Sequence, residues 1–212
     1  MRRFARSPRP PDASPVKRAF DIVFAAVALL VFSPLLAVIA IIVRLESHGP
    51  VFFRQRRVGM GEKPFQVLKF RTMRSTPGDE DSTPVPDVSD FSEYVFDPLY
   101  GGKEYTRIGH FLRTTSLDEL PNLINVLRGD MSIVGPRPEV PELVEQYLPD
   151  YRRRHDVRPG ITGLSQVSGR GSLTYEQTML YDLQYVDEHS PFRDLIILAK
   201  TVPAVLSRKG VQ

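Results

Sequence analysis

An adjacent acid pair, Asp118-Glu119, lies between basic residues and is the strongest candidate for chemistry in this sequence. Arg113 precedes the pair, and Arg128 and Arg137 follow it, the last within a Pro-Arg-Pro corner. Carboxylates near guanidinium groups suit chemistry on a phosphate. One acid can attack phosphorus or bind a metal ion while the guanidiniums neutralise the phosphate oxygens. We therefore predict that Asp118 and Glu119 are catalytic.

A helix cap explains the same acid pair without any catalysis. Residues 116–119 fit a capping box, in which Ser116 is the N-cap and Glu119 bonds back to its backbone. An acid in the first turn is also favoured by the helix dipole. In a helix capped by Ser116, Pro121 would have no N–H to donate to the Leu117 carbonyl. A helix that starts at Asp118 would instead place Pro121 in its first turn, where proline is tolerated. The pattern alone leaves capping and catalysis open.

The composition limits the class of protein. A chain of 212 residues with 42% hydrophobic content can bury a real core, most simply in one domain. The absence of cysteine excludes disulfides and thiolate metal sites, and the four histidines show no metal-ligand spacing. Residues 1–15 are basic and rich in proline and serine. They predict a disordered arm that contacts anionic lipid rather than nucleic acid, because interleaved aromatic residues are absent.

Residues 20–43 form an apolar run that can enter a membrane. About 24 residues make roughly 36 Å of helix, enough to cross a hydrocarbon core of about 30 Å. Ser33-Pro34 interrupts the run. Pro34 removes the hydrogen bond to the Leu30 carbonyl, and the Ser33 hydroxyl can satisfy a freed carbonyl one turn back, which predicts a hinge. Basic residues flank both ends, as expected of a helix that re-enters with both ends in the cytoplasm. A kinked helix that crosses once remains open.

The segment 50–73 contains two strand-like patches separated by a glycine-rich turn at 59–61. Lys69 and Arg71 alternate with Phe70, so both are placed on one strand face as candidate phosphate ligands. A solvated strand face is the alternative. Residues 75–104 form an acidic, proline-bearing insertion, which we interpret as a loop that serves as a lid or partner surface. A short helix over 105–114 should bring Arg113 towards the acid pair.

The rest of the chain is predicted to be mainly helical. An amphipathic helix is expected over 139–153, and another over 172–189 carries Asp182, a candidate nucleotide-binding residue. Between them lies a glycine-rich stretch in which Arg158 and Arg170 could bind a diphosphate, although no Walker or dinucleotide spacing is present. A last amphipathic helix over 191–208 suits either a membrane interface or packing on the core.

Taken together, these motifs resemble the bacterial sugar transferase family, the monotopic phosphoglycosyl transferases that start surface-glycan assembly. The resemblance covers residues 16–208 and rests on motifs that occur in order: KRAFDIV, the Ser33-Pro34 break, GPVFFRQRRVG, FQVLKFRTM, RTTSLDELPNLINVLRGDMSIVGPRP, RHDVRPGITGLSQVSGR and YDLQYV. It implies an α+β monotopic membrane protein with a re-entrant helix over 16–46, hinged at Ser33-Pro34. Amphipathic surface helices and a small sheet-bearing cytoplasmic catalytic domain over 47–212 would complete it.

The resemblance also implies an activity at the bacterial inner membrane. Sugar-1-phosphate would pass from a UDP-sugar to undecaprenyl phosphate, initiating exopolysaccharide, O-antigen or other glycoconjugate synthesis. Asp118 matches the family's nucleophile, which forms a covalent phosphosugar intermediate, and Glu119 matches its partner acid, associated with Mg²⁺ binding. The basic positions expected around the phosphates are Lys69, Arg71, Arg113 and Arg137. A homodimer through the membrane helix or the acidic insertion is compatible with the sequence.

Two other functions fit parts of the pattern. In a membrane-anchored regulatory or scaffold protein, Asp118-Glu119 would be only a helix cap, and Asp118→Asn would be tolerated. In a phosphohydrolase acting on nucleotide sugars, the same group would pass to water and give free sugar phosphate without any lipid. Replacement of Asp118 and product analysis therefore separate the three functions.

Overall fold

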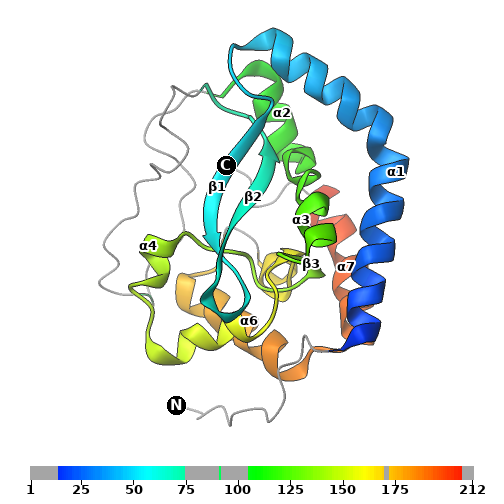
Figure 1. The fold of residues 1–212 in the computed structure, drawn as a ribbon. Helices are drawn as coiled ribbons and strands as arrows, with labels where there is room; N and C mark the ends of the chain where they lie inside the picture. The colour runs from blue at the N-terminus through cyan, green and yellow to red at the C-terminus, as the bar shows by residue number, and fades with distance from the viewer. Residues whose placement is uncertain (1–13, 75–90, 92–104, 170–171, 207–212) are drawn as a thin grey trace.

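The protein is seen here in a computed structural model, which describes residues 14–74, 91, 105–169 and 172–206 (Figure 1). Most of the predicted basic arm, nearly all of the acidic insertion and Arg170 lie outside the described residues. The described part combines helices with two small two-stranded sheets, in agreement with the α+β class predicted from the sequence.

The helix α1 (Pro15–Glu46) runs along one side of the molecule and leans over its top, as Figure 1 shows. Ser14 caps its start, and Pro15 occupies the first turn, where a missing N–H costs nothing. The Ser33 hydroxyl donates a hydrogen bond to the Leu30 carbonyl at 2.8 Å, which confirms the predicted partner for the carbonyl that Pro34 leaves free. The helix nevertheless continues through Pro34 as one element.

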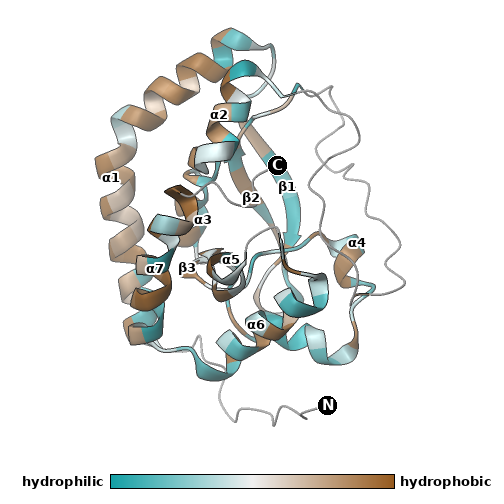
Figure 2. Ribbon diagram, turned by 180° about the vertical axis from the view of Figure 1, so that it is seen from behind, coloured by the Kyte–Doolittle hydropathy of each residue, from teal (hydrophilic) through white to brown (hydrophobic). Residues whose placement is uncertain are grey.

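The two ends of α1 pack on the body, whereas its middle is exposed. Near the start Lys17, Asp21 and Ala25 are buried, and near the end Ile39 and Val43 are buried. Large apolar side chains between these ends are exposed, including Val27, Leu30, Val31 and Phe32. Among the described residues α1 is the one helix long and apolar enough to cross a membrane, and the ribbon of Figure 2 shows that most of its residues are hydrophobic.

The predicted hairpin is confirmed. The strand β1 (Phe52–Val58) pairs antiparallel with β2 (Pro64–Phe70), and the short 3₁₀ turn η2 (Met60–Glu62) joins them. The outer edge of β2 bonds to side chains, because the Leu68 amide donates to Asn122 Oδ1 and Asn125 Oδ1, both at 3.1 Å. These asparagines belong to α3 (Asn122–Arg128), so that helix is fixed against the strand.

Three short helical elements follow the undescribed insertion. The helix α2 (Arg107–Thr115), close to the predicted one, begins at the Thr106 cap and ends where Ser116 adopts a left-handed conformation, at φ 57°. The turn η3 (Leu117–Glu119) comes next and leads into α3. Arg18 of α1 donates to the Val126 and Leu127 carbonyls, so α1 caps the end of α3.

A parallel pair that the sequence pattern did not predict lies beside these helices. The strands β3 (Ser132–Val134) and β4 (Gly160–Thr162) run close together because glycines line their contact. A Cβ on Gly160 would lie 2.1 Å from the Gly135 nitrogen, and a Cβ on Gly163 would lie 2.3 Å from the Gly135 carbonyl oxygen. These glycines therefore serve the close approach of two backbone segments.

The predicted amphipathic helix over 139–153 is wrong. The chain instead forms the single turn α4 (Pro141–Val144) and, later, the 3₁₀ segment η4 (Pro149–Asp156). Pro149 explains the break, because proline offers no N–H and disfavours helical backbone at the preceding residue; Leu148 is indeed extended, with ψ 147°. Phe91, the one described residue of the insertion, packs here against Tyr151 and Tyr175.

The last helices are close to their predicted positions. After the short α5 (Leu164–Ser168) come α6 (Tyr175–Glu188), which starts with a Thr174–Gln177 capping box, and α7 (Pro191–Leu206). The helix α7 buries Asp194 and Ile197 and leaves several large apolar side chains exposed, namely Phe192, Leu195, Ile196, Val202 and Leu206. In the ribbon of Figure 2, coloured by hydropathy, hydrophobic segments of α7 lie near the lower part of α1.

Candidate active site

The acid pair lies on η3, between the ends of α2 and α3. Ser116 serves as the C-cap of α2, and its backbone N–H donates to the Arg113 carbonyl at 3.1 Å. The Ser116 side chain makes no capping hydrogen bond to η3, and the Glu119 carboxylate accepts hydrogen bonds from Lys69 and Arg137. The capping-box interpretation is therefore wrong, and the side chain of Glu119 is available to a site.

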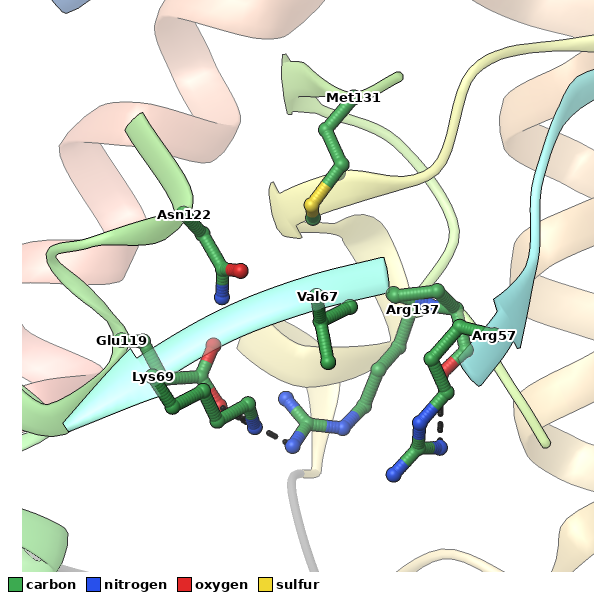
Figure 3. Close-up of a pocket in the computed structure, with 9 residues that line it drawn as sticks. Arg57, Val67, Lys69, Glu119, Asn122, Met131 and Arg137 are labelled. Atoms are coloured by element: carbon green, nitrogen blue, oxygen red, sulfur yellow. Dashed lines mark hydrogen bonds and ion pairs between the residues drawn. The ribbon is translucent and has the colours of Figure 1, made fainter. Parts of the chain in front are cut away.

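Glu119 joins three segments that are distant in the sequence. Its Oε1 atom accepts from Lys69 Nζ of β2 at 2.9 Å and from Arg137 Nη2 of the Pro-Arg-Pro corner at 3.1 Å. Figure 3 shows the side chains of Glu119, Lys69 and Arg137 converging. Burial opposes ionisation of Glu119, but Arg137 and Lys69 outweigh it and hold the pKa of this carboxyl well below its usual range. Glu119 is therefore ionised at every physiological pH.

Asp118 lies beside Glu119 in a different electrostatic state. Its side chain is buried, and this burial raises the pKa of Asp118 to about 6, against the pull of Lys69. The negative charge of Glu119 also raises the pKa, whereas Arg113 and Arg137 lower it. A buried carboxylate that becomes ionised close to neutral pH, surrounded by cations, is the environment of a catalytic group.

A pocket opens next to the pair. Its charged lining consists of one carboxylate, Glu119, and the cations of Arg57, Lys69 and Arg137, so it favours anions. Its other lining residues are Val67, Asn122, Met131, Pro138 and Gly160. Arg57 was not among the predicted site residues. Strand alternation could have indicated it, because Arg57 shares the buried face of β1 with Gln55.

Arg71 lies apart from this pocket. The strand β2 ends at Phe70, and the Arg71 guanidinium donates to the Ser47 carbonyl at 2.7 Å, the Ser47 hydroxyl at 2.8 Å and the His48 carbonyl at 2.9 Å. Ser47 is the C-cap of α1, where carbonyls lack helical partners and attract a cation. The structure thus shows Arg71 fixing the C-terminal end of α1.

Two other predicted nucleotide-binding residues are also engaged in the fold. Asp182 is buried and accepts from Arg154 Nη2 at 2.6 Å and from the Ser165 hydroxyl at 2.8 Å. Arg158 Nε donates to the Gly129 carbonyl at 2.9 Å, at the end of α3. The structure therefore brings three of the predicted basic residues to the acid pair. Lys69 and Arg137 form ion pairs with Glu119, and the charge of Arg113 lowers the pKa of Asp118.

The donor set fits a Mg²⁺ ion shared with a substrate. This ion keeps several waters and takes one or two carboxylates together with substrate phosphates. The two adjacent carboxylates of Asp118 and Glu119 meet that requirement, beside a pocket that favours anions. The described residues hold no cluster of three or more His, Cys, Asp or Glu side chains, so they offer no all-protein metal cage.

Comparison with known proteins identifies the family. The model of the bacterial sugar transferase family matches residues 12–208, nearly the whole chain. The chain belongs to the bacterial sugar transferase family. The match extends from the start of α1 to the end of α7, so the long apolar helix, the acid pair and the Pro-Arg-Pro corner all lie inside the family's common region.

Individual relatives of this sugar transferase are named as enzymes or production proteins. A UDP-glucose:undecaprenyl-phosphate glucose-1-phosphate transferase of Caulobacter vibrioides is 44% identical over 90% of this chain and 70% of its own length. The exopolysaccharide production protein ExoY of Rhizobium meliloti is 42% identical over 94% of this chain and 89% of its own length. An Escherichia coli enzyme with the same name as the first is 45% identical over 88% of this chain, but the match covers only 39% of that enzyme. The chain is accordingly a phosphoglycosyl transferase.

Proposed function

We propose that this transferase moves a sugar-1-phosphate from a UDP-sugar to undecaprenyl phosphate and so initiates exopolysaccharide synthesis. The names of its relatives support the donor class, the lipid acceptor and the pathway. The observation that carries the chemistry is the unequal acid pair. Glu119 is held ionised by Lys69 and Arg137, while Asp118 is buried beside it with a pKa raised to about 6.

In the first step, a carboxylate oxygen of Asp118 attacks the sugar-bearing phosphorus of the donor. A bond forms between that oxygen and phosphorus, and the bond from phosphorus to the bridging oxygen breaks, so UMP leaves with the electron pair. In the second step, an oxygen of the lipid phosphate attacks the same phosphorus and returns the Asp118 carboxylate. Use of one nucleophile in two steps gives ping-pong kinetics.

The surrounding side chains make this attack feasible. The diphosphate of the donor and the carboxylate of Asp118 repel each other, and the cations of Lys69 and Arg137 offset that repulsion. A Mg²⁺ ion held by Asp118 and Glu119 would neutralise further charge on the phosphate oxygens. Burial of Asp118 limits the access of water, which favours transfer to the lipid over hydrolysis.

We propose that the protein lies on the cytoplasmic face of the inner membrane, and the packing of α1 supports a re-entrant topology in which both helix ends are on that face. Lys17 near its start bonds to Asp194 at 2.8 Å, and Ser47 after its end bonds to Arg71 at 2.7 Å. One polar body thus holds both ends, whereas a helix that crossed the membrane would separate them by about 30 Å of hydrocarbon. In this proposal a bend at Ser33-Pro34, where the Ser33 hydroxyl bonds to the Leu30 carbonyl, would let the exposed middle of α1 enter and leave the same leaflet.

Mass spectrometry of the purified protein tests the proposal. The protein is incubated with a panel of UDP-sugars and Mg²⁺, without lipid, and then digested. We expect a sugar-phosphate adduct on the peptide that contains Asp118, its loss on addition of undecaprenyl phosphate, and no adduct on Asp118→Asn. Undiminished transfer to lipid by Asp118→Asn would overturn the mechanism. Release of free sugar phosphate at the same rate with and without lipid would instead indicate a phosphohydrolase.

A further inference from the structure

The Pro-Arg-Pro corner has no secondary structure of its own, yet its backbone is tightly held. Pro136 and Pro138 have no N–H, so this segment cannot join a sheet ladder by donating. Four successive carbonyls each accept a hydrogen bond from a different donor, listed in chain order: Pro136 from Gly160 N at 2.9 Å, Arg137 from Arg154 Nη2 at 2.7 Å, Pro138 from Arg57 Nη1 at 3.1 Å, and Glu139 from Val58 N at 2.9 Å.

Arg154 supplies the donor to the central carbonyl from the interior of the protein. It is only 2% exposed, and Asp182 Oδ2 accepts from its Nη2 at 2.6 Å while the Tyr147 hydroxyl accepts from its Nη1. Asp182 is itself oriented by the Ser165 hydroxyl, at 2.8 Å from Oδ1. A buried guanidinium with a paired carboxylate and fixed acceptors has one orientation, so the N–H that reaches the Arg137 carbonyl is fixed.

Arg57 holds the next carbonyl in a similar way. Its Nε and Nη2 atoms both donate to Gln55 Oε1, at 3.0 and 2.6 Å, and this orients Nη1 towards the Pro138 carbonyl. Nη1 also lies 3.4 Å from Glu139 Oε2. Arg57 lines the same pocket as Glu119 and Arg137, but its Nη1 is directed to the corner and its other two nitrogens to Gln55.

This support matters because the side chain of Arg137 is long and 37% exposed, and it reaches Glu119 only through its tip. We propose that Arg154 and Arg57 are positioning residues of the transferase. They hold the backbone of Arg137 so that its guanidinium meets Glu119 and the phosphates of the donor. The inference rests on the proposed function. A displacement of about 1 Å in a catalytic group can cost about 100-fold in rate, which is the scale of effect expected.

A double-mutant cycle distinguishes positioning from general stabilisation. We expect Arg154→Met to lower kcat/KM for the donor about 10- to 100-fold. If Arg154 acts through Arg137, then Arg137→Met/Arg154→Met should be no less active than Arg137→Met alone. Arg153→Met is the matched control, because it removes a neighbouring arginine of the same segment η4 whose guanidinium pairs with Asp187 of α6 and not with the corner. Its kcat/KM should stay close to that of the wild type.

Each of the other possible results overturns either this inference or the proposed function. Equal losses from Arg154→Met with Arg137 present and absent would show that Arg154 acts on the fold and not through Arg137. Near wild-type activity of a folded Arg154→Met would also overturn the inference. Where thermal unfolding shows that Arg154→Met is not folded, the same cycle with Arg57→Met decides by the same criteria. An inactive wild type with every UDP-sugar would overturn the proposed function, and the inference with it.

Discussion

Lys69 Nζ lies 2.9 Å from Glu119 Oε1, and this contact joins the edge of the β1–β2 hairpin to the turn that carries the acid pair. Both side chains are mostly buried, at 14% and 18% exposure. A charge-assisted hydrogen bond with this little solvent is strong and directional. The position of β2 therefore controls the charge state of both acids, because Lys69 lowers the pKa of Asp118 as well as that of Glu119.

Replacement of Lys69 should move the pH dependence of the enzyme. Asp118 reacts as the carboxylate, so kcat/KM should rise with pH through about 6 in the wild type. Lys69→Met removes a cation that lowers this pKa, so the acid limb should shift to higher pH and the activity at neutral pH should fall about 100-fold. Lys63→Met, at the exposed end of the hairpin, is the control and should leave the limb in place. An unshifted limb in Lys69→Met would contradict the prediction.

Asp118→Asn should increase stability while it abolishes transfer. The pKa of Asp118 is raised from 3.8 to about 6 by folding, so ionisation destabilises the native state as pH rises through this range. Asparagine removes that penalty. The variant should gain up to about 2–3 kcal/mol in free energy of unfolding at pH 7, and this gain should vanish below about pH 4. Denaturant unfolding between pH 4 and 8 measures it. If Asp118→Asn instead has a lower free energy of unfolding than the wild type, by an amount that does not change with pH, then Asp118 has a purely structural role.

Arg71→Met should affect α1 and not the binding of the donor. The guanidinium caps the C-terminal end of α1, and loss of hydrogen bonds to a charged group typically costs about 1.5–3 kcal/mol. We expect a lower free energy of unfolding and an unchanged KM for the UDP-sugar. Arg113→Met should give the opposite result. Because Arg113 lowers the pKa of Asp118, its replacement should change the activity of the enzyme and not the packing of α1. A raised KM in a stable Arg71→Met protein would restore the phosphate-binding role predicted from the sequence.

Both ends of α1 should be accessible from the same side of the membrane. The chain has no cysteine, so single cysteines can be placed at Val16 and Leu45, which are 65% and 81% exposed, and at Lys63 on the body. An impermeant maleimide should label all three in inside-out vesicles and none in right-side-out vesicles. Labelling of positions 16 and 45 from opposite sides would exclude the re-entrant topology in favour of a crossing helix.

Removal of divalent metal should stop formation of the adduct. Asp118 and Glu119 supply two adjacent carboxylates, and repulsion between donor phosphates and these acids requires a cation. We expect chelation to abolish transfer, Mg²⁺ to restore it, and Glu119→Gln to raise the Mg²⁺ concentration needed for half-maximal activity. Adduct mass and UMP release give independent readouts. Full activity after rigorous chelation would count against a metal.

The sequence by itself determined the elements that depend on local pattern. The long apolar helix, the hairpin around the glycine turn, α2, α6 and α7 follow from hydrophobic periodicity, caps and turn residues, which act over a few positions. The acid pair was found because its two members are adjacent in the chain. The prediction of a helix over 139–153 was wrong for a local reason as well. Pro149 interrupts the helical backbone there, although the side chains follow an amphipathic pattern.

Only the tertiary structure decided which charges meet. Lys69 and Arg71 are two residues apart, yet one reaches Glu119 and the other caps α1, because β2 ends between them. Asp182 pairs with Arg154, 28 residues away in the chain, and Arg154 supports the Pro-Arg-Pro corner through the Arg137 carbonyl. Ion pairs and hydrogen bonds depend on distances of a few ångströms in space. Residue spacing along a chain does not encode such distances once the chain has folded back on itself.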